Sequence, residues 1–200
     1  IAVLGHYFID ERGERGAVLQ DIRSSKAVGE YLTPKGATMH TWKVGRAFAA
    51  RKLRCLDGVW GGELAGHYYF RDFFYSDSGL LASILVLRIV ARFKKEGVSF
   101  SQLIDRVAKY QNSGEINFRI EDKKGAMDAV KAHFTGKEAP TAVMDFDGYR
   151  VEFPSWWFNI RPSNTEPYLR FICEASSKAL LEQKIEETKN LLVKDFGASL

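Results

Sequence analysis

Residues 17–60 read AVLQDIRSSKAVGEYLTPKGATMHTWKVGRAFAARKLRCLDGVW, and this stretch decides the first half of the fold. Short apolar runs bounded by turn residues indicate three strands, at residues 17–22, 37–42 and 57–60. Segments with helical apolar spacing lie between them, at residues 26–31 and 45–54, and Ser24 or Ser25 is placed to cap the first. Strands that alternate with helices predict a parallel α/β layer.

The residues around this stretch extend the layer to about residue 110. We expect residues 1–8 to end a helix, residues 61–76 to form a loop, and residues 77–95 to form a long helix. Within the long helix, apolar residues recur at helical spacing, at Leu80, Ile84, Leu87 and Ala91. This spacing predicts that they form the apolar face of the helix.

The second half has a different order of elements. Strands are expected at residues 115–120, 142–146, 149–153, 157–160 and 168–175, and helices at residues 122–134 and 177–196. The order βαββββα predicts an antiparallel sheet with helices on one face, so the predicted fold class is α/β followed by α+β. We expect two domains, residues 1–112 and 113–200, joined by the polar, flexible segment 111–114.

Composition narrows the class of protein. Apolar residues make up 46% and charged residues 27% of the chain, which is ordinary for a globular protein with a core. The net charge of +4 comes from 29 basic and 25 acidic residues scattered along the chain, which favours anionic partners only weakly. No run spans a bilayer and no signal segment opens the chain, so we expect a cytoplasmic protein. Cys55 and Cys173 are expected to be packing residues, and the start at Ile1 suggests a piece of a longer chain.

A polar turn interrupts the last two strands at Arg161-Pro162-Ser163-Asn164-Thr165-Glu166-Pro167. Two hydroxyls, an amide and the Arg161 guanidinium give this turn the donor lining that a phosphate dianion requires, and Arg170 supplies a second guanidinium. The alternative is an ordinary turn whose hydroxyls satisfy nearby backbone groups.

A second polar stretch, GGELAGHYYFRD at residues 61–72, follows the third predicted strand. Its Glu63 carboxylate is suited to accept from two adjacent sugar hydroxyls, and its His67 imidazole is suited to move a proton near neutral pH. The alternative is a His67 that packs against the neighbouring aromatic residues beside a solvated Glu63.

Together, GELAGHYYFRD, the following SDSG at 76–79 and RPSNTEPYLR at 161–170 resemble the C-terminal half of the α-D-phosphohexomutases. The resemblance is to the phosphomannomutase/phosphoglucomutase group and covers residues 1 to about 198. It implies an isomerase that interconverts hexose 1-phosphate and hexose 6-phosphate, of glucose or mannose, through a bisphosphate.

Members of that family have four domains, with a phosphoserine on the first and a Mg²⁺ loop on the second. This sequence contains neither a TASHNP-like serine loop nor a DGDxDR-like aspartate cluster. The resemblance therefore implies domains three and four alone, without a cofactor of their own and inactive without the first two domains. Mg²⁺ is implied for the full-length enzyme.

The resemblance also assigns roles to residues. It implies that Glu63 holds the sugar ring, with His67 beside it as a candidate proton-transfer group. Two further segments match loops that lie near the substrate in the family, and the resemblance implies that Arg23 and Arg46 contact the substrate from them. The phosphate that does not react would be held by Arg161, Ser163, Asn164 and Thr165, supported by Arg170.

Two positions depart from the family pattern. Ala65 stands where the family has serine, and Arg46 stands where it has histidine. Loss of one neutral hydrogen bond costs about 0.5–1.5 kcal/mol, so we expect an altered affinity with the same reaction class.

Two other classes of function compete with this interpretation. The chain would serve as a standalone sugar-phosphate binding module if no catalytic half accompanies it. A nucleic-acid binder is suggested only by the basic pI and the aromatic content, and its charges are not clustered. Hexose phosphate, rather than nucleic acid or a membrane, is the expected partner.

Overall fold

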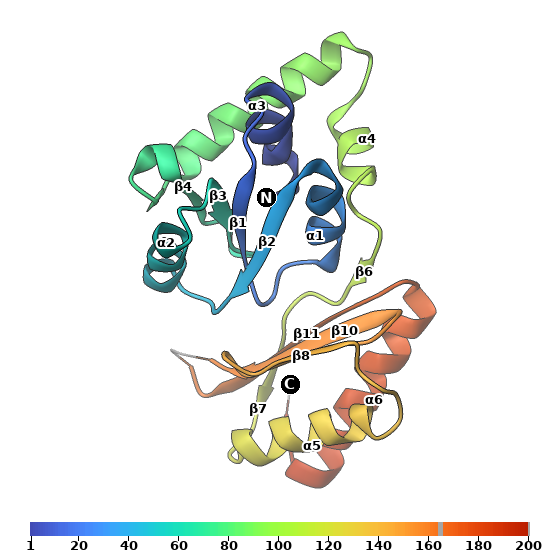
Figure 1. The fold of residues 1–200 in the computed structure, drawn as a ribbon. Coiled ribbons are helices and arrows are strands. Elements are labelled where there is room, and N and C mark those ends of the chain that lie inside the picture. Colours follow the sequence, from blue (N-terminus) through green and yellow to red (C-terminus); the bar gives the residue numbers. More distant parts are fainter. Residues whose placement is uncertain (164–165, 200) are drawn as a thin grey trace. The chain divides into compact units, whose positions relative to one another are not determined.

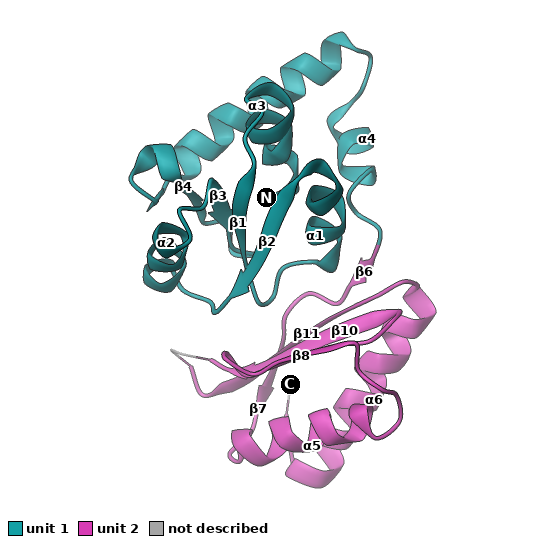
Figure 2. Cartoon of the chain, viewed as in Figure 1, with its two compact units in different colours: residues 1–109 teal, residues 110–200 magenta. Residues whose placement is uncertain are grey.

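The computed structural model describes residues 1–163 and 166–199, and the chain divides into two compact units (Figures 1 and 2). Unit 1 is Ile1–Lys109 and unit 2 is Tyr110–Leu200. Each unit has its own sheet and its own hydrophobic core.

The sheet of unit 1 is mixed, with the strand order β2-β1-β3-β4-β5. The strands are β1 (Gly16–Asp21), β2 (Ala37–Trp42), β3 (Trp60–Gly62), β4 (Tyr68–Phe70) and β5 (Ser76–Asp77). β1 pairs in parallel with β2 and with β3, whereas β4 and β5 join antiparallel. The α-helices are α1 (Lys26–Leu32), α2 (Arg46–Cys55), α3 (Gly79–Lys95) and α4 (Phe100–Asp105).

Helices cover both faces of this sheet (Figure 1). Because side chains alternate along a strand, Val18 and Leu19 point to opposite faces. Leu19 packs with Leu53 of α2, and Val18 packs in the larger core with Ile89 of α3 and residues of α1. The carboxyl ends of β1, β2 and β3 therefore emerge from a three-layered unit, as ligand-binding α/β sheets require.

Several expectations for unit 1 need correction. Residues 1–8 hold a 3₁₀ helix (Ala2–Leu4) and the start of a π-helix (His6–Glu11), and the third strand lies later than predicted. The expected loop 61–76 contains β4, a 3₁₀ turn (Arg71–Phe73) and the start of β5. A further 3₁₀ turn follows α1 (Thr33–Lys35).

The apolar face of α3 was assigned wrongly. Leu80, Ile84 and Leu87 are exposed, whereas Ala82, Leu85, Ile89 and Phe93 are buried. Both sets have helical spacing, and packing onto the sheet selects the second. Cys55 is exposed, so only Cys173 is a packing cysteine.

Unit 2 is an antiparallel sheet with two helices on one face (Figure 1). Its elements are β6 (Gln111–Asn112), β7 (Ile116–Arg119), α5 (Lys123–Thr135), β8 (Ala142–Met144), β9 (Tyr149–Glu152), β10 (Trp156–Pro162), β11 (Tyr168–Ala175) and α6 (Lys178–Phe196). Phe158 and Phe171 share a core with Phe134 of α5 and Leu192 of α6. The predicted fold class, α/β followed by α+β, is confirmed.

The segment 111–114 is not a flexible linker. β6 pairs with the end of β11, and the Ser113 amide and hydroxyl bond to the Cys173 backbone. β6 and β7 are thus two pieces of one edge, interrupted at Gly114, which has a φ of +66°. Of the helices described, none is long and apolar enough to cross a membrane.

Candidate functional site

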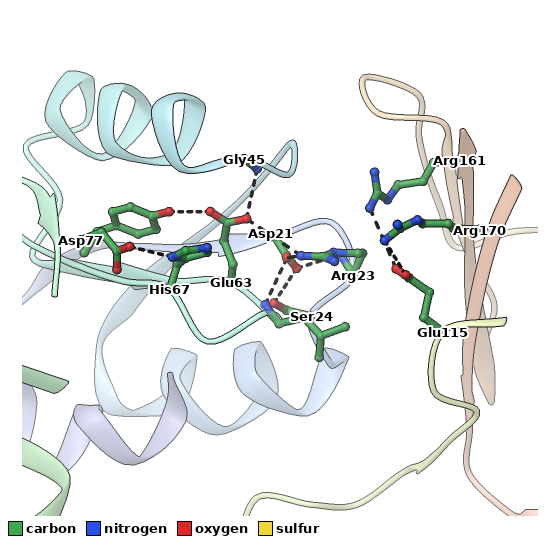
Figure 3. A network of polar contacts seen from close by, with 12 residues as sticks. Asp21, Arg23, Ser24, Gly45, Glu63, His67, Asp77, Glu115, Arg161 and Arg170 are labelled. Carbon is green, nitrogen blue, oxygen red and sulfur yellow. Dashed lines mark hydrogen bonds and ion pairs between the residues drawn. The ribbon is translucent and has the colours of Figure 1, made fainter. Parts of the chain in front are cut away.

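A tight hairpin between β3 and β4 places Glu63. The Glu63 amide donates to the His67 carbonyl, and Gly66 closes the turn with a φ of +87°. Although it lies in a turn, Glu63 is only 4% exposed. Its Oε1 accepts from the Tyr69 hydroxyl at 2.5 Å, and its Oε2 accepts from the Gly45 amide at 3.0 Å (Figure 3). The carboxylate is buried and fixed in direction, so the alternative of a solvated Glu63 is wrong.

Tyr69 is the neutral donor that holds this carboxylate. Its side chain is fully buried. Burial first, and then the hydrogen bond to Glu63, raise the pKa of the Tyr69 phenol. The phenol therefore stays protonated and donates to Glu63 at any physiological pH.

Arg23 is anchored beside Glu63 by a buried aspartate. Asp21, the last residue of β1, accepts from the Arg23 amide, Nε and Nη2 at 3.0, 3.0 and 2.6 Å. The same carboxylate accepts from Ser24 Oγ at 2.9 Å and from the Leu64 amide at 3.1 Å. Asp21 thereby joins the loop after β1 to the loop after β3, and it leaves Arg23 Nη2 3.9 Å from Glu63 Oε2 (Figure 3).

His67 is oriented by Asp77 of β5. Asp77 Oδ2 lies 2.6 Å from His67 Nδ1, and Asp77 Oδ1 accepts from the Tyr68 amide at 3.0 Å. Because an ionised carboxylate only accepts, Nδ1 is the donor, and neutral His67 carries its lone pair on Nε2. The His67 side chain is 44% exposed, so the alternative of a packed core histidine is wrong.

Arg46 is the first residue of α2, and its side chain is exposed. Among the described residues, Arg46 forms no hydrogen bond or ion pair with Glu63 or His67. Its positive charge does act on Tyr69, where it opposes the rise in the phenol's pKa.

In unit 2, Arg161 and Arg170 lie directly opposite each other in the β10–β11 register. Their neighbours Ile160 and Leu169 point into the helix-covered core, so alternation puts both arginines on the other face of the sheet. Arg161 is only 3% exposed. Arg170 Nη1 lies 2.7 Å from Glu115 Oε1, and Arg161 Nη2 lies 3.9 Å from Glu115 Oε2 (Figure 3). Arg170 also pairs with Glu166.

In the turn after Arg161, Ser163 bonds to nearby backbone groups, as the alternative of an ordinary turn predicts. The Ser163 amide donates to the Tyr168 carbonyl, and Ser163 Oγ accepts from the Glu166 amide at 3.2 Å. Asn164 and Thr165, both predicted phosphate contacts, lie outside the described residues. Arg161 and Pro162 belong to β10, so the turn is shorter than predicted.

A second turn supports Arg161 from the side. Gly148, between β8 and β9, has a φ of +65°. A Cβ atom at this position would come within 2.2 Å of the Ile160 carbonyl oxygen and 2.5 Å of Arg161 Cβ. Only glycine allows the hairpin to lie this close to the Arg161 backbone.

The sequence did not reveal the groups that position these side chains. Asp21, Tyr69, Asp77 and Glu115 each hold a predicted site residue. Asp21 could have been identified from the sequence, because it precedes Arg23 at the carboxyl end of a predicted strand. Within the described residues there is no group of three or more His, Cys, Asp or Glu side chains that could hold a metal ion.

Comparison with known families divides the chain as its structure does. Residues 1–110 match the family model "Phosphoglucomutase/phosphomannomutase, alpha/beta/alpha domain III", and residues 115–191 match the family's C-terminal domain. A phosphomannomutase of Methanocaldococcus jannaschii is 35% identical over 199 residues, which are 100% of this chain and 42% of that protein. A protein of Xanthomonas campestris named "Phosphohexose mutases" is 39% identical over 180 residues, 88% of this chain and 39% of the relative.

Solved structures agree with these matches. A phosphoglucomutase/phosphomannomutase family protein from Burkholderia thailandensis superposes with a TM-score of 0.77 at 25% identity, over 96% of this chain and 40% of that one. An N-acetylglucosamine-phosphate mutase shares the fold, with a TM-score of 0.67 at 13% identity over 96% of this chain and 42% of that one. This chain spans about two fifths of the length of the relatives it matches. With both of its units matched by the family's domains, the chain belongs to the phosphoglucomutase/phosphomannomutase family of α-D-phosphohexomutases.

Proposed function

We propose that this chain is the substrate-recognition half of a mutase that interconverts hexose 1-phosphate and hexose 6-phosphate through a bisphosphate. The observation that carries the proposal is the buried Glu63 carboxylate, fixed in direction by Tyr69 and Gly45. A carboxylate oxygen has a second lone pair, so Glu63 retains the capacity to accept from two adjacent sugar hydroxyls. Unit 1 is the sugar-binding unit in this proposal.

Arg23 and Arg46 supply positive charge to the same unit. Asp21 fixes the Arg23 guanidinium near Glu63, so the guanidinium is already in position to contact a substrate oxygen. Arg46, which replaces the family's histidine, is exposed and has no such anchor among the described residues, so its contribution is the weaker of the two.

Unit 2 is the phosphate-binding unit. Arg161, Ser163, Asn164, Thr165 and Arg170 hold the phosphate that does not react. Two facing guanidiniums support this role, because such forks match phosphate oxygens in pairs. Phosphoryl transfer depends mainly on positioning and charge, so a firm hold on the distal phosphate provides much of the required orientation.

His67 is the candidate for proton transfer. Asp77 fixes the ring through Nδ1 and leaves the lone pair on Nε2, which suits His67 to take a proton from a substrate hydroxyl. The phosphoserine and Mg²⁺ are assigned to the rest of the full-length protein, and the chain alone is expected to have no turnover.

The experiment is titration calorimetry of the chain with glucose 6-phosphate, mannose 6-phosphate, inorganic phosphate and free glucose. Hexose phosphates are expected to bind more tightly than either phosphate or glucose, because they engage both kinds of contact. Phosphate binding that gains nothing from the sugar would contradict the role of Glu63. Turnover of glucose 1-phosphate by the 200-residue chain would contradict the division of labour.

A further inference from the structure

A cavity in unit 1 is lined by none of the residues assigned above to hexose phosphate, although one of them, Arg46, is on a helix that lines it. It measures about 330 Å³ and is lined by Trp42, Lys43, Phe48, Arg51, Lys52 and Cys55. Trp42 ends β2, and the last four residues come from α2. The volume is at the lower end of the ~300–1,000 Å³ range of small-molecule pockets.

The lining is positively charged and contains no acid. Lys43, Arg51 and Lys52 take part in no ion pair with a carboxylate in the part of the chain that the structure describes. The whole of α2, RAFAARKLRC, has four basic residues and no acidic one. This differs from the rest of the molecule, where most arginines are paired with carboxylates. A concave wall with charge of one sign concentrates counter-ions.

Two aromatic rings hold the lysines at this wall. Lys43 Nζ lies 4.3 Å from the centre of the Phe48 ring, and Lys52 Nζ lies 4.3 Å from the centre of the Trp42 ring. Such cation–π contacts restrain an ammonium group without neutralising its charge.

We propose that this cavity is a second anion site, which binds a compact polyanion such as a pyrophosphate or a small phosphate ester. Arg51 supplies the fork-shaped donor that fits phosphate oxygens, and the two lysines supply point charges. The small volume selects against a nucleic acid, and three unneutralised cations select for more than one negative charge. The proposal does not depend on the sugar-phosphate assignment, because it uses none of those residues.

Cys55 provides a reporter in the wall of the cavity. It is exposed, whereas Cys173 is buried, and burial raises the pKa of the Cys173 thiol to about 12. A thiol reagent added to the native chain therefore reacts with Cys55. The rate of this reaction is to be measured with an anionic aromatic disulfide, 5,5′-dithiobis(2-nitrobenzoate), and with the neutral 4,4′-dithiodipyridine.

The probe ligand is pyrophosphate, compared with sodium chloride at the same ionic strength. Pyrophosphate is expected to slow both reagents in a saturable way, whereas salt slows only the anionic one. In its absence the three cations should accelerate the anionic reagent, relative to the neutral one, by about tenfold.

Arg51→Gln should remove most of the protection by pyrophosphate. Arg54→Gln is the matched control, because Arg54 is on the same helix, is outside the lining and bonds to the Phe74 carbonyl. Protection that is equal in the two variants, or matched by salt alone, would overturn the proposal.

Discussion

The Glu63 carboxylate and the guanidiniums of the Arg161–Arg170 pair carry opposite charges, and they are held by different kinds of neighbouring group. Glu63 is held by a neutral phenol and a backbone amide, and its one cationic neighbour among the described ion pairs, Arg23, is itself held by Asp21. The two arginines lie beside Glu115, and Arg170 also pairs with Glu166. A phosphate that binds there must compete with carboxylates.

The difference separates a preorganised site from a competitive one. Binding to the carboxylate of unit 1 depends on hydrogen-bond geometry, which responds little to salt. Binding to the arginines of unit 2 exchanges one set of anions for another, so it should respond to salt and to the charge of neighbouring acids. Substitutions in the two units should therefore have different signatures.

The largest effect is expected from Arg161→Ala. Loss of charged hydrogen bonds of about 1.5–3 kcal/mol corresponds to about 10- to 150-fold weaker binding. Calorimetry should show this loss for glucose 6-phosphate and for inorganic phosphate alike. Arg161→Lys keeps the charge but not the fork-shaped donor. Its affinity should lie between those of the unmodified chain and of Arg161→Ala. An affinity within twofold of the unmodified chain would remove Arg161 from the site.

Glu63→Gln should produce the complementary pattern. The amide keeps the shape but not the charge of the acceptor, so glucose 6-phosphate should bind about 5- to 30-fold more weakly. Inorganic phosphate should bind as before. Tyr69→Phe keeps the carboxylate and removes one of its donors, so it should repeat the pattern at a smaller size. If the affinities for glucose 6-phosphate and for inorganic phosphate fall equally in Glu63→Gln, then Glu63 has been assigned to the wrong part of the ligand.

Glu115→Gln tests the competition directly. Removal of one carboxylate beside two guanidiniums should strengthen phosphate binding, by about three- to fivefold. The gain should shrink as salt is added, which a titration at two ionic strengths would show. Weaker binding in this variant would mean that Glu115 positions the arginines rather than competes for them.

Ala65→Ser is expected to have the smallest effect. It restores the hydroxyl that the family pattern contains, in an exposed turn. A single neutral hydrogen bond at an exposed position should improve hexose phosphate binding about twofold and leave inorganic phosphate unchanged. Ala65→Val, which adds bulk without a donor, is the control, and equal gains in both variants would argue against a new hydrogen bond.

Local sequence signals predicted much of the fold. β1, α1 and β2 were placed to within a residue or two, because each is a short periodic run between strong turn residues. β4 and β5 were missed, since strands of three and two residues are too short to show alternation. The buried face of α3 was misassigned because apolar residues surround its first turns, and only packing decides between the faces.

The candidate site was also predicted only in part from the sequence. Glu63, His67 and Arg161 were identified because they stand in unusual polar stretches, although their roles remain proposals. Their partners are distant in the sequence. Asp77 is ten residues from His67, and Glu115 is 55 residues from Arg170. Such pairs are created by strand register, which a single sequence does not specify.

The closeness of Gly148 to Arg161 has a consequence for how this protein tolerates mutation. Any side chain at residue 148 would push on the backbone that carries a predicted phosphate ligand, although Gly148 itself belongs to a different hairpin. In a screen of all substitutions, this glycine should therefore behave like a ligand-binding residue. Variation there would be restricted by a function that its own atoms do not perform.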